Sequence, residues 1–141
     1  MLMDVLVRGI EFEDLDSDRL MTFLSKNQKT QVVDGKCFFG EKHLIHSILQ
    51  TLKAFRGGKN IAKTQELEFL VRFSGERQIK KALARCKPGK RAVFISWSNS
   101  RERIFSNLKK EFRFKLRDLI EPDEEKQKAA IERTATFYLS S

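Results

Sequence analysis

The 141-residue sequence contains few cysteines. Its only two, Cys37 and Cys86, form neither a CxxC pair nor a disulfide framework. Such sparse use of cysteine favours a reducing compartment. No apolar run approaches the length of a membrane span, and the N-terminus lacks the apolar region of a signal peptide. We therefore expect a soluble intracellular protein, located in the cytoplasm or, in a eukaryote, also in the nucleus.

Repeats and low-complexity segments are also missing, and the chain length predicts a single domain over residues 1–141. Apolar residues make up 40% of the sequence and include 12 phenylalanines, which is enough for a packed core. Although 33% of the residues are charged, apolar residues recur in nearly every segment, and this argues against disorder.

Positive charge is concentrated in the middle of the chain, whose net charge is +9. Residues 26–117 carry 23 basic and seven acidic residues, whereas residues 1–25 carry two and six and residues 118–141 carry three and six. A basic surface attracts polyanions, of which nucleic acids are the obvious examples. A well-solvated surface rich in lysine and arginine is the alternative interpretation.

Hydrophobic spacing predicts both strands and helices. Strands are expected over residues 4–12 and 91–97, the second as a buried central strand, and a hairpin that turns at Asp34-Gly35 is expected over residues 30–39. Helices are expected over residues 16–27, 40–55, 64–73, 76–86 and 100–112, and from Pro122 onward. Residues 112–120 fit either a strand or an extension of the preceding helix. The fold class is α+β, with a small mixed or antiparallel sheet of about four to five strands packed with several helices.

Apolar stripes predict the buried faces of the helices, as two of them illustrate. In the first helix, Leu20, Met21 and Leu24 share one face, and Asp16 or Ser17 is the expected cap. In the helix over residues 40–55, the expected stripe consists of Leu44, Ile45, Ile48, Leu49, Leu52 and Phe55.

The stretch FRGGKNIAK, residues 55–63, contains two glycines and a lysine, as phosphate-binding loops do. A Walker A loop needs an earlier glycine and a Ser or Thr after its lysine, and it follows a strand. Here the first glycine is absent, Asn60 occupies the Ser/Thr position, and a helix comes before the loop. We therefore do not expect nucleotide hydrolysis at this loop.

Metal and catalytic sites are not expected either, and no cofactor is implied. His43 and His46 lie three residues apart near Cys37, a spacing that can bind zinc, but a fourth ligand is missing. No Ser-His-Asp group is visible, and Glu66 and Glu68 point to different faces of their helix. The sequence does not argue for an enzyme.

Residues 55–91 offer the chemistry of an RNA-binding surface. Glycine amides approach phosphate closely, lysines bind phosphate, and guanidinium and amide groups suit the edges of unpaired bases. We expect Lys59 and Arg72 to be exposed there. A solvated basic face is the alternative.

Residues 41–83, EKHLIHSILQTLKAFRGGKNIAKTQELEFLVRFSGERQIKKAL, resemble the PRPK-binding protein family (TPRKB in eukaryotes), the small accessory subunit of the KEOPS complex. The resembling features are an H-x-x-H helix, a short basic loop that ends in Ile61-Ala62, a glutamate-led helix, and the stretch SGERQI followed by Lys80-Lys81-Ala82. The match is good over residues 41–97, and the ends agree only in the order of their elements.

The resemblance implies a non-catalytic, regulatory role in making threonylcarbamoyladenosine in tRNA. It implies two partners, a PRPK-like kinase/ATPase subunit that the protein binds and stimulates, and tRNA, which it captures by the single-stranded CCA end. Carried over residue by residue, RNA contact falls on Lys59, Asn60, Ile61, Ala62, Arg72, Ser74, Gly75, Gln78 and Ile79. Charge and proximity add Arg56, Lys63 and Lys81, and Ile79 also fits the core stripe of its helix.

For the kinase-binding surface, the resemblance suggests the terminal segments, where Phe137, Tyr138 and Leu139 are apolar near the end of the chain. These three residues equally fit the protein's own core. Two other functions stay open: a free-standing single-stranded nucleic-acid-binding protein with a basic surface, and a small nucleotide-dependent enzyme around Gly57-Gly58-Lys59.

Overall fold

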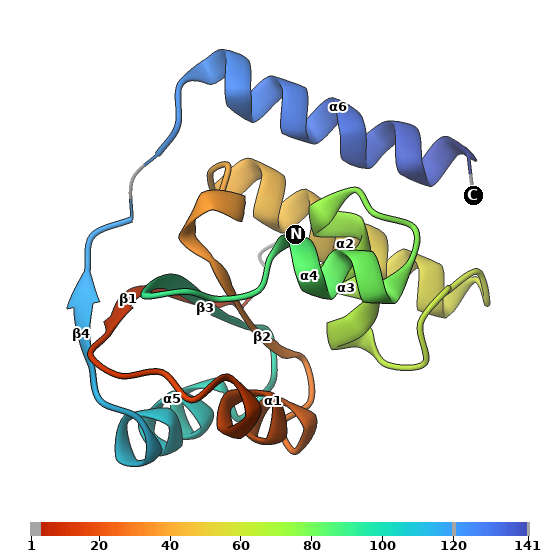
Figure 1. The fold of residues 1–141 in the computed structure, drawn as a ribbon. Helices are drawn as coiled ribbons and strands as arrows, with labels where there is room; N and C mark the ends of the chain where they lie inside the picture. Colours follow the sequence, from red (N-terminus) through yellow and green to blue (C-terminus); the bar gives the residue numbers. More distant parts are fainter. Residues whose placement is uncertain (1–3, 120, 141) are drawn as a thin grey trace. The chain divides into compact units, whose positions relative to one another are not determined.

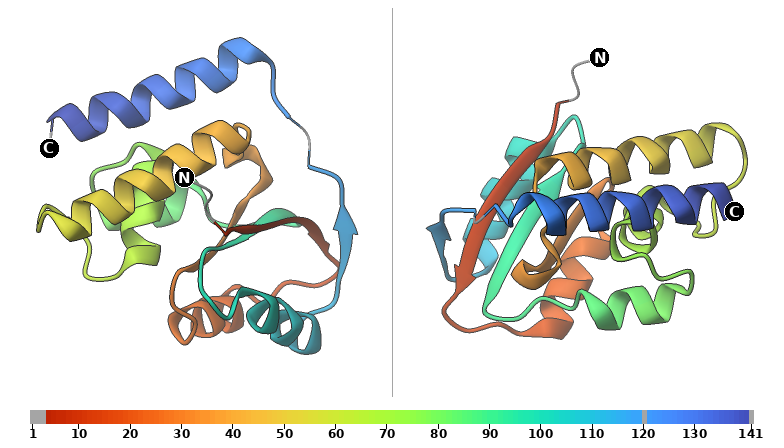
Figure 2. Two further views of the ribbon diagram at one scale, coloured as in Figure 1. Left: turned by 180° about the vertical axis from the view of Figure 1, so that it is seen from behind. Right: turned by 90° about the horizontal axis from the view of Figure 1, so that it is seen from above.

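The computed structural model describes the backbone of residues 4–119 and 121–140, and the side chains of residues 4–119 and 121–135 (Figures 1 and 2). This part of the chain forms six α-helices and four strands, and the strands make one antiparallel sheet in the order β2-β3-β1-β4. The strands are β1 (Leu6–Phe12), β2 (Thr30–Asp34), β3 (Arg91–Ser96) and β4 (Phe114–Arg117). The predicted α+β fold with a sheet of four to five strands is confirmed.

The chain divides into two compact units, each built from two stretches of sequence. Unit 1 comprises residues 1–36 and 87–119, and unit 2 comprises residues 37–86 and 120–141. The prediction of a single domain over residues 1–141 is not tested by this division and stays a prediction.

Unit 1 contains the sheet and two helices, α1 (Ser17–Ser25) and α5 (Arg101–Glu111), which cover one face of the sheet (Figure 1). Asp16 caps α1, because its Oδ1 accepts hydrogen bonds from the backbone N–H groups of Asp18 and Arg19. Phe23 is buried in the core beside Leu20 and Leu24. The prediction that Met21 belongs to this buried face is wrong, since its side chain is 47% exposed.

The sequence predicts the middle of the sheet, whereas at its edge the structure decides between the strand and the longer helix that residues 112–120 both fit. β3 pairs with both β1 and β2 and is buried from Ala92 to Ser96, so the predicted central strand is confirmed. Phe112 ends α5 in an extended conformation, and the chain continues into β4 rather than lengthening the helix. β4 lies at one edge of the sheet, where Leu116 is 58% exposed.

The predicted hairpin over residues 30–39 is wrong. β2 ends at Asp34 and a short 3-10 helix, η1 (Gly35–Cys37), follows in place of a second strand. The partner of β2 is β3, which lies far away in the sequence. Because β3 supplies the hydrogen bonds that a hairpin partner would supply, the residues after Asp34 are released to lead into unit 2.

Unit 2 contains the helices α2 (Glu41–Arg56), α3 (Gln65–Ser74), α4 (Ile79–Arg85) and α6 (Glu124–Ser140). α3 packs against α2 and α4, and its residues from Glu68 to Ser74 are all buried. α6 lies alongside α2, as Figures 1 and 2 show, and Asp123 caps it by accepting from the backbone N–H of Lys126. No described helix has the length and apolar character needed to cross a membrane.

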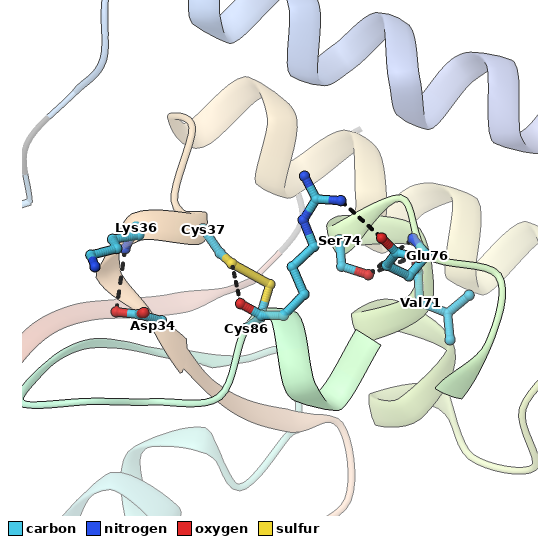
Figure 3. Close-up of a disulfide and its surroundings, with 8 residues drawn as sticks. Asp34, Lys36, Cys37, Val71, Ser74, Glu76 and Cys86 are labelled. Atoms are coloured by element: carbon cyan, nitrogen blue, oxygen red, sulfur yellow. Dashed lines mark hydrogen bonds and ion pairs between the residues drawn. A yellow bond between two sulfur atoms is a disulfide. The ribbon is translucent and has the colours of Figure 1, made fainter. Parts of the chain in front are cut away.

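Cys37 and Cys86 form a disulfide in unit 2, with their Cα atoms 5.9 Å apart (Figure 3). The expectation that the two cysteines do not pair is therefore wrong. They lie 49 residues apart in the sequence, so no short sequence motif predicts the pairing. The bond joins the first residue of the 37–86 segment to its last, where this part of unit 2 begins and ends.

Candidate nucleic-acid interface

The glycine-containing loop begins where α2 ends. Gly57 caps the helix, and its N–H donates to the carbonyl of Lys53. Gly58 adopts a left-handed conformation (φ 68°), which favours glycine. The N–H of Lys59 then donates to the carbonyl of Ala54 at 2.8 Å. This turn directs the following residues outward, and the side chains of Lys59, Asn60, Ile61 and Lys63 are all exposed.

The second half of the loop is fixed to α3 by a buried carboxylate. Glu68 Oε1 accepts hydrogen bonds from the backbone N–H groups of Ile61 and Ala62, both at 2.7 Å. Asn60 Nδ2 donates to the carbonyl of Ala62 at 2.9 Å. Ala62 is only 1% exposed, so its side chain serves the packing of unit 2 and is not available for RNA. Ile61, in contrast, is 43% exposed between two lysines.

Arg72 does not lie where the sequence predicts it. Its Nε donates to Glu68 Oε2 at 2.9 Å, and both side chains are 0% exposed. The predicted exposure of Arg72 is wrong, because a glutamate four residues earlier on the same helix turns it into the unit. The sequence analysis did not predict these contacts of Glu68, although a Glu-Arg pair at this spacing is a visible signal for the ion pair.

A second group of predicted residues lies at the junction of α3 and α4. Gly75 ends α3 in a left-handed conformation (φ 77°). Ser74 is buried, and its hydroxyl donates to the carbonyl of Val71 and accepts from the N–H of Glu76 (Figure 3). Gln78 is exposed. Ser74 thus shapes the junction from inside the unit and does not present its side chain to solvent.

The basic side chains of this part of unit 2 mostly point to solvent. The exposed ones are Arg56, Lys59, Lys63, Arg77, Lys80, Lys81 and Arg85. Arg85 pairs with Glu76 at 2.9 Å, and Ile79 is half-buried at the start of α4, between core and surface. Of the cations that the sequence predicts for RNA contact, Arg56, Lys59, Lys63 and Lys81 are exposed and Arg72 is buried. Arg85, which is held by Glu76, is not among the predicted contacts.

The predicted partner-binding residues Phe137, Tyr138 and Leu139 belong to the last turns of α6. Their side chains lie outside the described residues, and their assignment stays a prediction.

The two histidines have hydrogen-bond partners within unit 2. His43 Nε2 lies 3.2 Å from Thr134 Oγ1, and His46 Nε2 lies 3.3 Å from Gln50 Nε2. Burial lowers the pKa of His43 to about 4, and the positive charges of Arg133 and His46 add to this effect. Among the described residues, no three His, Cys, Asp or Glu side chains come together as metal ligands would.

The loop also lacks the setting of a nucleotide-hydrolysing site. It connects two helices, α2 and α3, whereas a Walker A loop connects a strand to a helix. Its exposed lysines, the exposed Ile61 and its glycine backbone instead suit contact with phosphates and the face of an unpaired base.

Comparison with known proteins finds a partial similarity. Over 57 residues, the chain is 39% identical to the KEOPS complex subunit Cgi121 of Pyrococcus abyssi (strain GE5 / Orsay). The matched segment makes up 40% of this chain and 32% of that protein, so it spans about a third of the relative's length. No family model matches the chain. The similarity supports a KEOPS-related family without specifying a member.

Proposed function

We propose that the protein is a non-catalytic, tRNA-binding subunit of a KEOPS-related complex that makes threonylcarbamoyladenosine in tRNA. The similarity to a KEOPS complex subunit supports the assembly and the pathway. The observation that carries RNA binding is the loop of unit 2, which holds the exposed Lys59, Asn60, Ile61 and Lys63 on a backbone fixed from inside. In this role the lysines contact phosphate and Ile61 packs on an unpaired base.

The proposal includes two finer points. The unpaired RNA is the CCA end of tRNA, and the protein partner is a small kinase/ATPase subunit that this chain binds and stimulates, through the end of α6. The complex works in the cytoplasm, or also in the nucleus if the source is eukaryotic. These points follow the resemblance of residues 41–83 to the PRPK-binding protein family.

Fluorescence anisotropy with full-length tRNA, and with the same tRNA lacking its CCA end, tests this function. Selective loss of binding without the CCA end is expected. Equal binding to both RNAs would favour a free-standing single-stranded nucleic-acid-binding protein, and purification without any kinase-like partner would favour it further. ATP turnover by the pure protein that disappears in Lys59→Ala would favour an enzyme instead.

Charge reversal at the loop gives a mutational test. We expect the double variant Lys59→Glu, Lys63→Glu to weaken tRNA binding by about tenfold to a hundredfold at low salt, because two phosphate contacts become repulsive. The effect should shrink as salt is raised, since counterion release drives the binding. Titration of both proteins at two salt concentrations measures it.

The control places the same charge change on unit 1. Lys110 and Lys115 are both exposed, and in Lys110→Glu, Lys115→Glu the net charge falls as far as in the loop variant. This variant should keep most of its tRNA affinity. Equal losses in the two variants would show that general charge, not the loop, governs binding.

A further inference from the structure

Glu68 connects parts of the candidate interface that are separate in the sequence. One carboxylate oxygen accepts the N–H groups of Ile61 and Ala62, both at 2.7 Å, and the other accepts Arg72 Nε at 2.9 Å. Glu68 and Arg72 are each 0% exposed. We infer that Glu68 is a positioning residue, which holds residues 59–63 in the conformation that contacts RNA. This inference rests on the function proposed above.

The role of Arg72 changes accordingly. A side chain that is fully buried beside a carboxylate does not reach a phosphate on the surface. Its guanidinium group instead balances the charge of Glu68, which would otherwise be costly to bury. Arg72 therefore acts on RNA only through Glu68 and the loop. A change at Arg72 alone, which leaves the carboxylate of Glu68 buried without its ion-pair partner, weakens RNA binding without removing a contact to RNA.

The loop needs such an anchor. It starts at two successive glycines, whose backbones have the most freedom to lose on folding, and Gly58 already lies in the left-handed region. Two charge-assisted hydrogen bonds to a buried carboxylate order it before any ligand arrives. Without the anchor, RNA binding has to order the loop, which lowers affinity by about tenfold.

Two double variants separate positioning from direct contact. In Glu68→Met, Arg72→Met both buried charges and the acceptor disappear, and apolar replacement of a buried ion pair is compatible with folding. In Glu68→Gln, Arg72→Met the net charge is the same, but the amide oxygen at position 68 still accepts hydrogen bonds from Ile61 and Ala62. Each variant is examined by amide hydrogen exchange resolved by residue, by thermal unfolding and by anisotropy with full-length tRNA.

The Met-Met variant should exchange the amides of Ile61 and Ala62 at least about tenfold faster and bind tRNA about tenfold more weakly, at a similar unfolding temperature. The Gln-Met variant should keep the slow exchange and most of the affinity. Equal loss in both variants would assign the effect to Arg72 itself and overturn the inference, as would full affinity in the Met-Met variant.

A surface ion pair in the same unit provides the matched control. Glu76 and Arg85 pair at 2.9 Å with side chains 30% and 48% exposed, so Glu76→Gln, Arg85→Met removes a pair without touching the loop. This variant should leave the exchange rates of the Ile61 and Ala62 amides and the affinity for tRNA unchanged.

These measurements distinguish a failure of the proposed function from a failure of the positioning role of Glu68. Wild-type protein with no affinity for tRNA would overturn the proposed function, and this inference with it. Wild-type protein that binds tRNA, together with an unchanged exchange rate of Ile61 and Ala62 in the Met-Met variant, would overturn the positioning role alone.

Discussion

His43 is a titratable residue in an apolar setting. Its ring stacks on Phe73 with 4.8 Å between the ring centroids, and it is 1% exposed. Because burial lowers its pKa from 6.5 to about 4, the unfolded chain binds more protons than the folded protein between these two values. The stability that neutral His43 contributes is complete above the unfolded value and is lost as the pH falls through the folded value.

We therefore expect acidification to destabilise the wild-type protein more than the variant His43→Gln, whose side chain does not titrate. From about pH 7.5 to about pH 5, the difference should be about 2 kcal/mol in the free energy of unfolding. Urea unfolding at both pH values measures it. Identical pH dependence in the two proteins would mean that His43 titrates normally. The comparison is made between the two proteins, because every other titratable group is common to both.

For single residues, the sequence predicts the type of interaction better than it predicts the exposure of the side chain. The loop lysines are exposed as expected, because a short polar connector has no room to bury them. Arg72 is buried, because the opposite charge of Glu68 at i−4 offsets the desolvation cost of its guanidinium group and because most residues of α3 are buried. The disulfide depends on the tertiary approach of residues 49 apart, which spacing alone does not encode.

Apart from the hairpin over residues 30–39, the elements themselves are well predicted, and the other errors concern which neighbours the elements have. The expected stripe on α2 includes Leu49, which is 41% exposed, whereas the polar residues His43, Gln50 and Thr51 are buried. α2 packs against both α3 and α6, so its buried face is wider than the predicted apolar stripe and is centred on a different side of the helix. Helical periodicity gives the helix, but a polar face can be buried wherever a second helix satisfies its hydrogen bonds.

α6 is held to the unit by such polar contacts, and Thr134 is central to them. Its hydroxyl lies 3.2 Å from His43 Nε2 and its carbonyl accepts from Gln50 Nε2 at 2.9 Å. We expect Thr134→Val to cost about 1–3 kcal/mol in the free energy of unfolding, since it leaves a buried ring nitrogen without this partner. Amide exchange along α6 should accelerate more than exchange in α3.

Thr51→Val is the control for this prediction. Thr51 is equally buried in α2, but its hydroxyl donates to Ser47 within the same helix. Its loss should not loosen α6 selectively. If both variants accelerate exchange in α6 alike, the helix is held by its apolar contacts and Thr134 has no special part.

For the whole molecule, what could not be predicted is how the chain is divided. The pattern of strands and helices correctly indicates an α+β fold, but the chain passes between two units and returns to each. Residues 87–119 complete the sheet that residues 1–36 begin, and residues 120–141 add α6 to the helices of unit 2. Such long-range assembly leaves no periodic signal, because periodicity reports only on neighbours within one element.

The disulfide of unit 2 gives a test of its own. It closes the segment that carries α2, α3 and α4, and a loop with a separation of 49 residues is expected to gain about 4 kcal/mol from the reduced entropy of the unfolded chain. We expect dithiothreitol to lower the guanidinium midpoint of unfolding and to speed amide exchange in these three helices. The double variant Cys37→Ser, Cys86→Ser should start at the lower midpoint and ignore the reductant. Thiol titration of the denatured, unreduced protein should find no free thiol. Two free thiols, together with an unfolding midpoint that does not respond to reductant, would contradict the disulfide and would instead support the reducing compartment expected from the sparse cysteines.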